Sequence, residues 1–505
     1  MTPPQSKLMI CAGIPFNNNH KDILLFTDET SKYNYFTSKA KFPPISEVTY
    51  MRNQPGTPIR VEISADMLRD CNYIMYQNSA YGAKWFYAFI TSVEYVNDGC
   101  SFIYFEEDFF QTWNLQAEIM PCFVEREHTN NDAIGANTLP ENVELGPYIT
   151  TAQTSLKATN LSIYILSTDA NSKPFWNDPA IVGGFPVPVY WVSLGTISDF
   201  SVSVMKTILD DYSAAGKAEA IVGVFTAPTN MVSTQAGIRE QTLSCAPRTL
   251  SYTPKNNKLY TYPYCALALS ALGQGEILRY ELFSADATLK IRGGFGGNMQ
   301  VSAIPQNYQG ETESISYTLS IKDWPACAWV TNYYQNWLAQ NKASLIINTA
   351  TAAAQTIAGG AIAYASGGLA GGGMALSGVT QIAGTIAEVY QHSILPDKMS
   401  GSANAADINA VSGISGFYSY CKSIRPEYAK VIDDYFSMFG YKTNKVKSPN
   451  LTGRQSWNFV KTISSTVRGA IPQDVARKIE TMLDNGATFW HTFDVGNYNL
   501  NNNIV

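Results

Sequence analysis

Alternating apolar and polar residues dominate the first 130 positions of the chain. The segment Lys84–Trp113 contains two runs rich in aromatic and β-branched residues, on either side of Asn97-Asp98-Gly99. Asp-Gly accepts the positive φ angles of a tight turn, so this segment predicts a β-hairpin. Alternate residues of a strand point to opposite faces. The more apolar face of the first strand, which we expect to point to the core, carries Tyr87, Phe89, Thr91, Val93 and Tyr95.

The middle of the chain mixes strand patterns with one helix pattern. Short apolar runs predict strands over 161–168 and 220–228. Asp199 as an N-cap, apolar residues at helical spacing and Gly216 as a stop predict a helix over 199–216. From 258 to 330, several short strands at regular spacing indicate a sandwich or a barrel.

The last hundred residues predict two helices separated by a strand. The first helix spans Arg425–Tyr441, with Pro426 near its start and Gly440 at its end; the second spans Pro472–Gly486. Residues 454–464 form the strand pattern between them. We therefore expect a mainly β fold with some helix and a mixed α/β C-terminal segment.

A long stretch without charge interrupts this pattern. From Ala343 to Ala387 there is no charged side chain, and eight of the 24 residues from Thr356 to Val379 are glycine. Its length exceeds the roughly 20 residues of one helical membrane crossing. The side chains that favour lipid are few: Ile357, Ile362, Leu369, Leu376, Val379, Ile382 and Ile386.

The energetics of this stretch indicate a conditional membrane segment. These seven side chains contribute about −2 to −4 kcal/mol near the bilayer centre, which one Asp or Lys at that depth would cancel. The run of glycines should break any helix into short pieces. The stretch is therefore predicted to be a membrane-active or lumen-stowed loop. A buried Ala/Gly-rich helical hairpin, a flexible linker and a constitutive transmembrane hairpin are the alternatives.

Composition excludes several functions. The net charge is −6 and Lys and Arg do not cluster, which argues against tight nucleic-acid binding. The eight cysteines form no CxxC pair and are expected to be buried thiols. The N-terminal sequence does not have the pattern of a secretory signal.

No arrangement of residues predicts catalysis. His20, His128, His392 and His491 are far apart and lack nucleophile motifs, and His491 is expected to pack and hydrogen-bond. Three other polar or glycine-rich segments are also not expected to form an active site. Arg292–Asn298 is expected to form glycine turns, Asp433-Asp434 a solvated helix face, and Glu106–Phe109 no acid–base site. We expect no enzyme activity, and no catalytic, cofactor-binding or metal-binding residues.

Several segments together resemble the distal tail tube, or tail knob, proteins of small short-tailed bacteriophages of Gram-positive hosts, the Picovirinae type. The likeness covers roughly residues 10–130, 258–340 and 400–500. The segments that carry it are "YIMYQNSAYGAKWFYAFITSVEY", "FFQTWNL", "FVEREH", "YPYC", "LKIRGGFG", "FGYKTNKVKSPNLTGRQSWNFVKT", "DNGATFWH" and "VGNY".

The resemblance implies a homohexameric tube of β-barrel domains in the virion tail, made in the host cytoplasm. It implies that DNA passes through the lumen, and that apolar loops plug the lumen and later form a pore in the host membrane. Other phage tail proteins are implied partners. The expected division is a first tube part over 1–130, an inserted knob-like domain over 131–257, a second tube part over 258–340, the apolar loop over 341–400, and a C-terminal α/β segment over 401–505.

Two other functions compete with this one. The aromatic segments Lys173–Pro179 and Pro186–Leu194 would suit a receptor-binding protein that contacts cell-wall carbohydrate. A cell-wall hydrolase is the other rival, although no carboxylate pair or Cys-His arrangement supports it.

Overall fold

The protein forms two compact units in the computed structural model. The N/C unit combines Met1–Leu145, Tyr252–Leu259 and Pro426–Val505, and the middle unit combines Gly146–Ser251 and Tyr260–Arg425. The structure describes residues 6–48, 57–82, 84–159, 161–167, 180–182, 189–196, 214, 221–232, 238–272, 274–296, 298–321, 326–327 and 416–505. Within them the fold is mainly β with few helices, as the sequence predicts.

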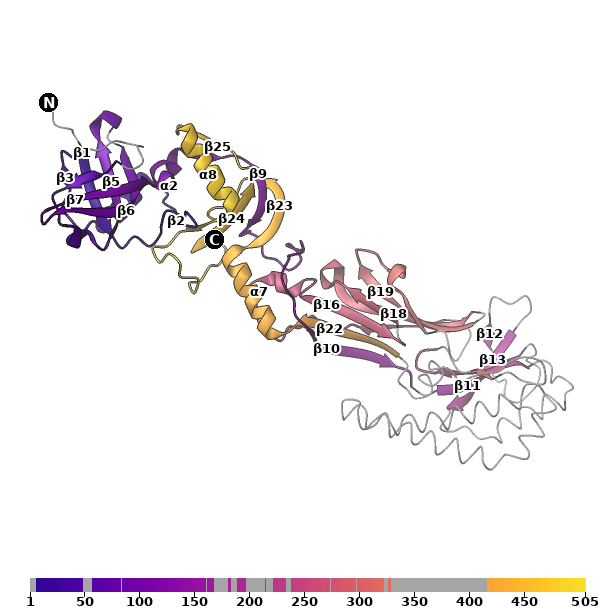
Figure 1. Ribbon diagram of the computed structural model, residues 1–505. Helices are drawn as coiled ribbons and strands as arrows, with labels where there is room; N and C mark the ends of the chain where they lie inside the picture. Colours follow the sequence, from indigo (N-terminus) through magenta and orange to yellow (C-terminus); the bar gives the residue numbers. More distant parts are fainter. Residues whose placement is uncertain are drawn as a thin grey trace, which may run out of the picture. The chain divides into compact units, whose positions relative to one another are not determined.

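The first sheet of the N/C unit has six antiparallel strands in the order β3-β1-β5-β6-β7-β4 (Figure 1). Their bounds are β1 Ser6–Ala12, β3 Ile45–Ser46, β4 Ile59–Val61, β5 Cys71–Asn78, β6 Trp85–Asn97 and β7 Cys100–Glu107. The predicted hairpin is confirmed, because Asn97 pairs with Cys100. The side chain of Asn97 accepts the N–H of Gly99 at 3.0 Å within the turn.

Both faces of β6 are buried in its first half, so the predicted core face is confirmed for Tyr87 and Phe89 but is not the only one. Phe86 and Ala88 pack inside the curl of the sheet with residues of β1, β4, β5 and β7. Tyr87 and Phe89 belong to an apolar cluster on the other face, which also contains Tyr35 and Phe36 of α1 (Glu29–Ser38) and two C-terminal tryptophans. A register shift after Ile90 places Val93 with the first group, and Tyr95 is 60% exposed.

The second sheet of the N/C unit joins segments from both ends of the chain, in the order β2-β26-β24-β9-β23. Its strands are β2 Asp22–Leu24, β9 Cys122–Glu127, β23 Tyr441–Lys447, β24 Trp457–Ile463 and β26 Ala487–Trp490. β2 runs parallel to β26 and the other pairs are antiparallel. The strand predicted over 454–464 is β24. A separate pair joins β8 Ala117–Ile119 to β25 Val467–Gly469.

The two predicted C-terminal helices are present as α7 (Pro426–Phe439) and α8 (Gln473–Asn485). α8 packs against β24 and buries Val475, Ile479, Met482 and Leu483, which recur at helical spacing (Figure 1). On α7 the apolar Val431 is 69% exposed, whereas Asp433, which was expected to be solvated, is buried. The reason lies in the polar contacts of Asp433 described below.

The middle unit contains three sheets, and the two that flank its described core form a sandwich. The first has the order β10-β22-β16-β17, and the second β15-β18-β19-β20. Alternate residues of both sheets fill one apolar core, among them Leu267 of β16, Ile291 of β18 and Phe417 of β22. The bounds are β10 Tyr148–Lys157, β15 Arg239–Ser244, β16 Cys265–Ala271, β17 Gln274–Leu278, β18 Phe283–Gly296, β19 Asn298–Tyr308, β20 Leu319–Ile321 and β22 Gly416–Ile424.

The third sheet of the middle unit has the order β12-β13-β11-β14-β21. Its strands are β11 Leu161–Ser167, β12 Ala180–Val182, β13 Val189–Thr196, β14 Ile221–Pro228 and β21 Ala326–Cys327. β11 and β14 confirm the strands predicted over 161–168 and 220–228. Apart from Ala214, the helix predicted over 199–216 lies outside the described residues. In the described part of the chain, no helix has both the length and the apolar character needed to cross a membrane.

Gly440 is the position where the N/C unit depends most clearly on glycine. It follows α7 with φ +64°, and a Cβ there would overlap the backbone of Glu127 and His128. We predict that Gly440→Ala lowers the free energy of unfolding of the N/C unit by about 2–5 kcal/mol, from the left-handed backbone and the overlap together. Urea unfolding followed by tryptophan fluorescence measures this change.

Gly13→Ala is the matched control, because Gly13 has φ +68° and no atom within 4 Å of its added Cβ. Only the backbone contribution of about 1–2 kcal/mol is then expected. Equal losses in the two variants would show that the contact with Glu127 is unimportant.

Candidate functional site

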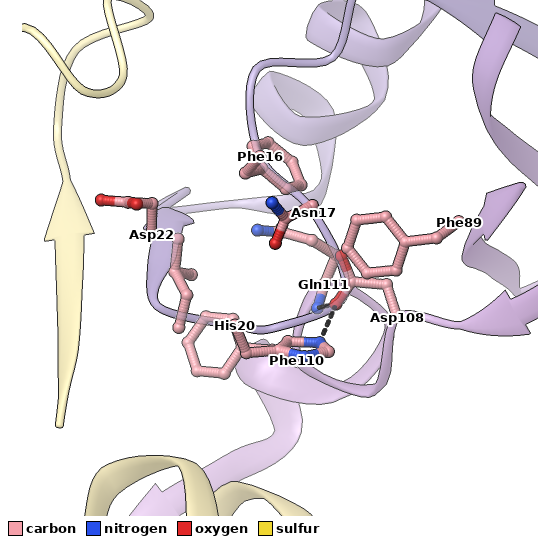
Figure 2. A pocket seen from close by; sticks show the side chains of 9 residues that line it. Phe16, Asn17, His20, Asp22, Phe89, Asp108, Phe110 and Gln111 are labelled. Carbon is pink, nitrogen blue, oxygen red and sulfur yellow. Dashed lines mark hydrogen bonds and ion pairs between the residues drawn. The ribbon is translucent and has the colours of Figure 1, made fainter. Parts of the chain in front are cut away.

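The polar cluster around Asp108 is the first candidate for chemistry. Asp108 caps the short helix α2 (Phe109–Trp113) and accepts the N–H of Gln111 at 3.0 Å. Its other oxygen accepts the hydroxyl of Tyr73 at 2.9 Å. His20 Nε2 lies 3.4 Å from Asp108 Oδ1, and both side chains are buried (Figure 2). A carboxylate beside an imidazole is an arrangement that acid–base catalysis also uses.

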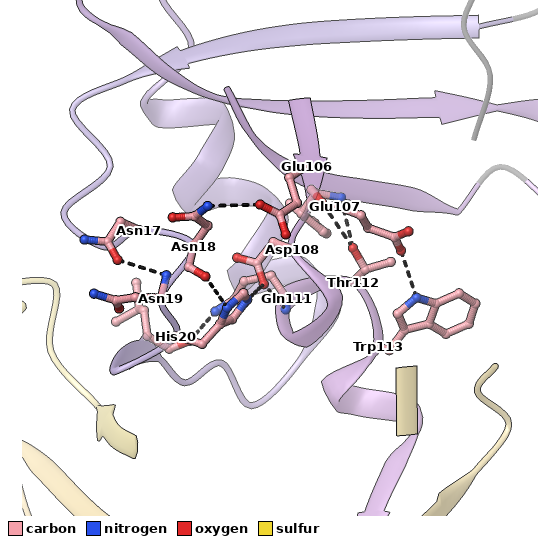
Figure 3. Close-up of polar contacts among 12 residues, drawn as sticks. Asn17, Asn18, Asn19, His20, Glu106, Glu107, Asp108, Gln111, Thr112 and Trp113 are labelled. Carbon is pink, nitrogen blue, oxygen red and sulfur yellow. Dashed lines mark hydrogen bonds and ion pairs between the residues drawn. The ribbon is translucent and has the colours of Figure 1, made fainter. Parts of the chain in front are cut away.

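The surroundings of His20 fix its position. His20 has φ +53°, its Nδ1 lies 2.9 Å from the carbonyl oxygen of Asn18, and its ring stacks on Phe109 with centroids 4.1 Å apart. Asn18 in turn donates to Glu106 at 2.9 Å (Figure 3). The residues that line this closed pocket are Phe16, Asn17, His20, Asp22, Ile23, Phe89, Asp108, Phe110 and Gln111.

This pocket is built for packing rather than for a reaction. Its lining holds no serine, cysteine or lysine that His20 could activate. Both oxygens of Asp108 already accept structural hydrogen bonds. Buried Lys32 of α1 donates to the carbonyl of Gln111 at 2.7 Å and to Asn114 at 2.9 Å, and burial lowers the pKa of Lys32. The cluster therefore fixes α1, α2 and the loop before β2 to one another.

The second cluster centres on Asp433, where the prediction of a solvated side chain was wrong. Asp433 is fully buried and its carboxylate accepts four hydrogen bonds. They come from the Tyr252 hydroxyl at 2.9 Å, the Lys255 N–H at 2.7 Å, the Asn256 N–H at 3.0 Å and the Asn256 side chain at 2.8 Å. The adjacent Asp434 is 48% exposed at its side chain and forms an ion pair with Lys255.

Glu141 extends this cluster with a second buried carboxylate. Lys258 donates to it at 2.6 Å, and both side chains are only 1% exposed. Arg126 and the N–H of Lys442 bind the same carboxylate. Burial lowers the pKa of Lys258, and Glu141 opposes this shift. Removing one partner of a buried charge pair leaves the other charge without compensation, so each member depends on the rest.

These two carboxylates hold a short passage of the chain in the N/C unit. Residues 252–259 lie between two long stretches that belong to the middle unit. Asp433 binds the start of this passage, and Glu141 binds Lys258 near its end. The chemistry of the cluster is therefore structural: it fixes the points in the sequence where the chain enters and leaves the N/C unit.

His128 is a third buried polar group of the N/C unit. Its Nδ1 accepts the N–H of Phe459 at 2.8 Å, and its Nε2 lies 3.1 Å from the carbonyl oxygen of Ser437. A neutral ring with its proton on Nε2 satisfies both contacts, whereas a proton on Nδ1 would break the first. Burial, followed by the charge of Arg454, lowers the pKa of His128 to about 3.

Some of the remaining predicted residues lie in the described part of the chain, where their roles can be compared with the prediction. His491 Nε2 donates to the side-chain oxygen of Asn458 at 3.1 Å, and the adjacent Trp490 is fully buried, which confirms the structural role predicted for this pair. The prediction of glycine turns over Arg292–Asn298 was wrong for most of this segment, because 292–296 lie in β18 and pair with β19, with Gly296 opposite Asn298. The structure describes the side chains of seven cysteines, and all seven are free and buried, as predicted.

Other predicted residues lie outside the described part of the chain. They are Ile357, Ile362, Leu369, Leu376, Val379, Ile382 and Ile386 of the apolar loop, together with His392 and the aromatic segment 173–179. Within the described ranges, no group of three or more His, Cys, Asp and Glu side chains is arranged to hold a metal ion.

Comparisons with known families match both ends of the chain. The family model of the C-terminal domain of the tail knob protein gp9 of Bacillus phage phi29 matches residues 224–503, which is more than half of the chain. The model of the N-terminus of caudoviral major tail proteins matches residues 4–118. The second match covers the curled six-stranded sheet.

Full-length relatives agree with these matches. The tail knob protein gp9 of Bacillus phage phi29 is 26% identical over 592 aligned positions, which cover 99% of this chain and 98% of the relative. That of Bacillus phage B103 is 25% identical over 586 positions and 98% of each chain. The structure of the bacteriophage C1 tail knob protein gp12 has a TM-score of 0.62 at 15% identity, and covers 99% of this chain and 100% of its own.

We predict that Asp433→Asn lowers the free energy of unfolding of the N/C unit by about 3 kcal/mol. The new amide would present N–H groups to donors that now bind a carboxylate, and buried charged hydrogen bonds contribute about 1.5–3 kcal/mol each. Asp434→Asn is the matched control on the next residue, with an expected change within about 0.5 kcal/mol. Denaturant unfolding measures both, and similar losses would contradict the role of Asp433.

His128 should make the N/C unit sensitive to acid. Its pKa in the folded state is about 3, below the ordinary 6.5, so the unfolded chain binds the proton more readily. The stabilisation is complete above about pH 6.5 and is lost as the pH falls toward 3, at up to about 1.4 kcal/mol per pH unit. We predict that His128→Gln reduces this slope between pH 4 and 6, measured by urea unfolding. A slope equal to that of the wild type would contradict the assignment.

Proposed function

The chain belongs to the family of the phage phi29 tail knob protein gp9, and on that premise we propose that six copies form a hollow distal tail tube and knob that conducts DNA. Membership of this family makes the chain a structural component of the phage tail in the virion, rather than an enzyme. A tail component assembles with other tail proteins. The proposal goes beyond family membership in three respects: the hexamer, the path of the DNA and the role of the apolar loops.

The curled sheet of the N/C unit supports a tube wall. It matches the N-terminus of caudoviral major tail proteins, and its curl is filled by its own apolar side chains. A tube wall needs such self-contained elements, because the lumen must stay open for DNA. We assign residues 1–130, 258–340 and 401–505 to tube-associated parts, 131–257 to an inserted knob-like domain and 341–400 to the loop.

The observation that carries the membrane part of the proposal is the uncharged stretch from Ala343 to Ala387. It lies between two strands of the middle unit, β21 and β22. β22 is a nine-residue central strand that pairs with both β10 and β16. The strand that follows the stretch is therefore paired on both sides within the core of the sandwich.

The energetics suit a loop that is released on demand. Insertion changes the free energy by about −2 to −4 kcal/mol per copy, which is too little to hold a permanent membrane span. In a hexamer the same gain is multiplied by six, so insertion of all six loops together becomes substantially favourable. Before release, the absence of charge lets the loops pack with one another as a plug in the lumen.

We predict that Leu369→Asp abolishes dye release from liposomes by the assembled protein. One aspartate at the bilayer centre costs about 2.5–3.5 kcal/mol, which cancels the gain of its whole copy. Release of an encapsulated fluorescent dye between about pH 4 and 7 measures the effect. Deletion of Ala343–Ala387 should have the same result.

Ile315→Asp is the matched control, because Ile315 is a 73% exposed side chain of the middle unit and the same charge is added. It should leave dye release unchanged. Negative-stain images of both variants should show the same sixfold rings as the wild type. If the wild type and the deletion variant release dye equally, or if neither releases any, the membrane function is wrong. Wild-type monomers at high concentration would contradict the tube.

A further inference from the structure

Two buried cysteines of the middle unit lie side by side across neighbouring strands. Cys265 is on β16 and Cys421 is on β22, and their sulfur atoms are 3.7 Å apart. Cys265 pairs with Ser423 and Leu267 pairs with Cys421, so the two cysteines are diagonal neighbours on one face of the sheet. Both belong to the apolar core that the two sheets share.

Cys421 is fully buried, and a short loop lies over its sulfur. The N–H of Thr249 lies 3.4 Å from the Cys421 sulfur, and that sulfur lies 3.3 Å from the carbonyl oxygen of Thr249. Residues 245–250 have no regular secondary structure, and Thr249 itself is exposed. A small movement of one loop would therefore bring a small solute to this sulfur.

The two thiols differ in their readiness to react. The hydrogen bond from Cys265, with help from Thr249, lowers the pKa of Cys421, and the same contact raises the pKa of Cys265. Cys421 is therefore the thiol that loses its proton more readily, and the Cys265 sulfur, 3.7 Å away, lies where it can resolve the first oxidation product. Cys245 in the same core is a useful contrast, because burial alone raises its pKa to about 12.

We propose that Cys265 and Cys421 are a redox-active dithiol, which a hydroperoxide converts to an intramolecular disulfide in the virion outside the host cell. The Cys421 thiolate attacks the peroxide O–O bond; after protonation this gives a sulfenic acid and releases one water or alcohol. The Cys265 sulfur then attacks the sulfenic sulfur, an S–S bond forms, and a second water leaves with the Cys265 proton. Two thiols lose two electrons, and the peroxide gains them.

The disulfide would tie together two strands 156 residues apart in the sequence. This span contains the uncharged stretch from Ala343 to Ala387, so the strand that follows the stretch would become covalently joined to β16. Cross-links that close long loops constrain the unfolded chain most. We expect the unfolding temperature of the middle unit to rise by about 5–10 °C. The proposal does not depend on pore formation by the stretch.

The test treats the full-length protein with hydrogen peroxide, then blocks free thiols with iodoacetamide in denaturant and maps the peptides by mass spectrometry. We expect a linked peptide that joins Cys265 to Cys421, formed at least about tenfold faster than any oxidation of Cys245. Dithiothreitol should reverse both the link and the rise in unfolding temperature. Cys245→Ser should keep the linked peptide, and Cys265→Ser and Cys421→Ser should lose it.

Three results would overturn the proposal. They are sulfinic acid at Cys421 without a link to Cys265, oxidation of Cys245 at the same rate as Cys421, and links scrambled among several cysteines. The rates and links in the wild-type protein decide the matter even if a serine variant does not fold.

Discussion

The N/C unit depends on two buried carboxylates, Asp433 and Glu141, that gather three distant segments of the chain. Burying a charge is costly unless hydrogen bonds and opposite charges compensate it. Here Asp433 accepts four hydrogen bonds from residues 252–256, and Glu141 binds Lys258, Arg126 and the Lys442 backbone. A different arrangement of these segments would leave charges unpaired. The cluster therefore specifies one connection between the ends of the unit and its short central passage.

The two units use different means of stabilisation. The sandwich of the middle unit is held by one apolar core, in which alternate residues of two sheets meet. The N/C unit adds aromatic packing to its polar clusters, since Trp457 and Trp490 belong to one buried cluster with Tyr73 and Tyr87 of the six-stranded sheet. A protein in the phage tail must persist without a cell to replace it, and buried cores of both kinds suit that demand.

Local patterns predicted the local elements well. The hairpin of β6 and β7, and the helices α7 and α8, follow from turn residues, helix-ending glycines and apolar spacing within a few positions. The burial of Asp433 could not be predicted, because its partners lie about 180 residues earlier in the chain. The second buried face of β6, which carries Phe86 and Ala88, was missed because the curl of the sheet brings residues of β1, β4, β5 and β7 over it.

Only part of the candidate site could be predicted from the sequence. Asp108 follows two glutamates in a run that predicts a strand end, and nothing local indicates that it caps α2 beside His20. Helix α1 was missed because its tyrosines, threonines and serines do not form an apolar stripe. The pairing of Cys265 with Cys421 required the register of β16 and β22, which sequence spacing does not contain.

The parallel pair of β2 and β26 has a consequence for biosynthesis. Asp22 of β2 accepts the indole N–H of Trp490 at 2.9 Å, across 468 positions of sequence. β26 is translated long after β2, and the strands of the middle unit are translated between them. The second sheet can therefore close only after the chain of the middle unit has been synthesised, and β2 has no β26 to pair with until then.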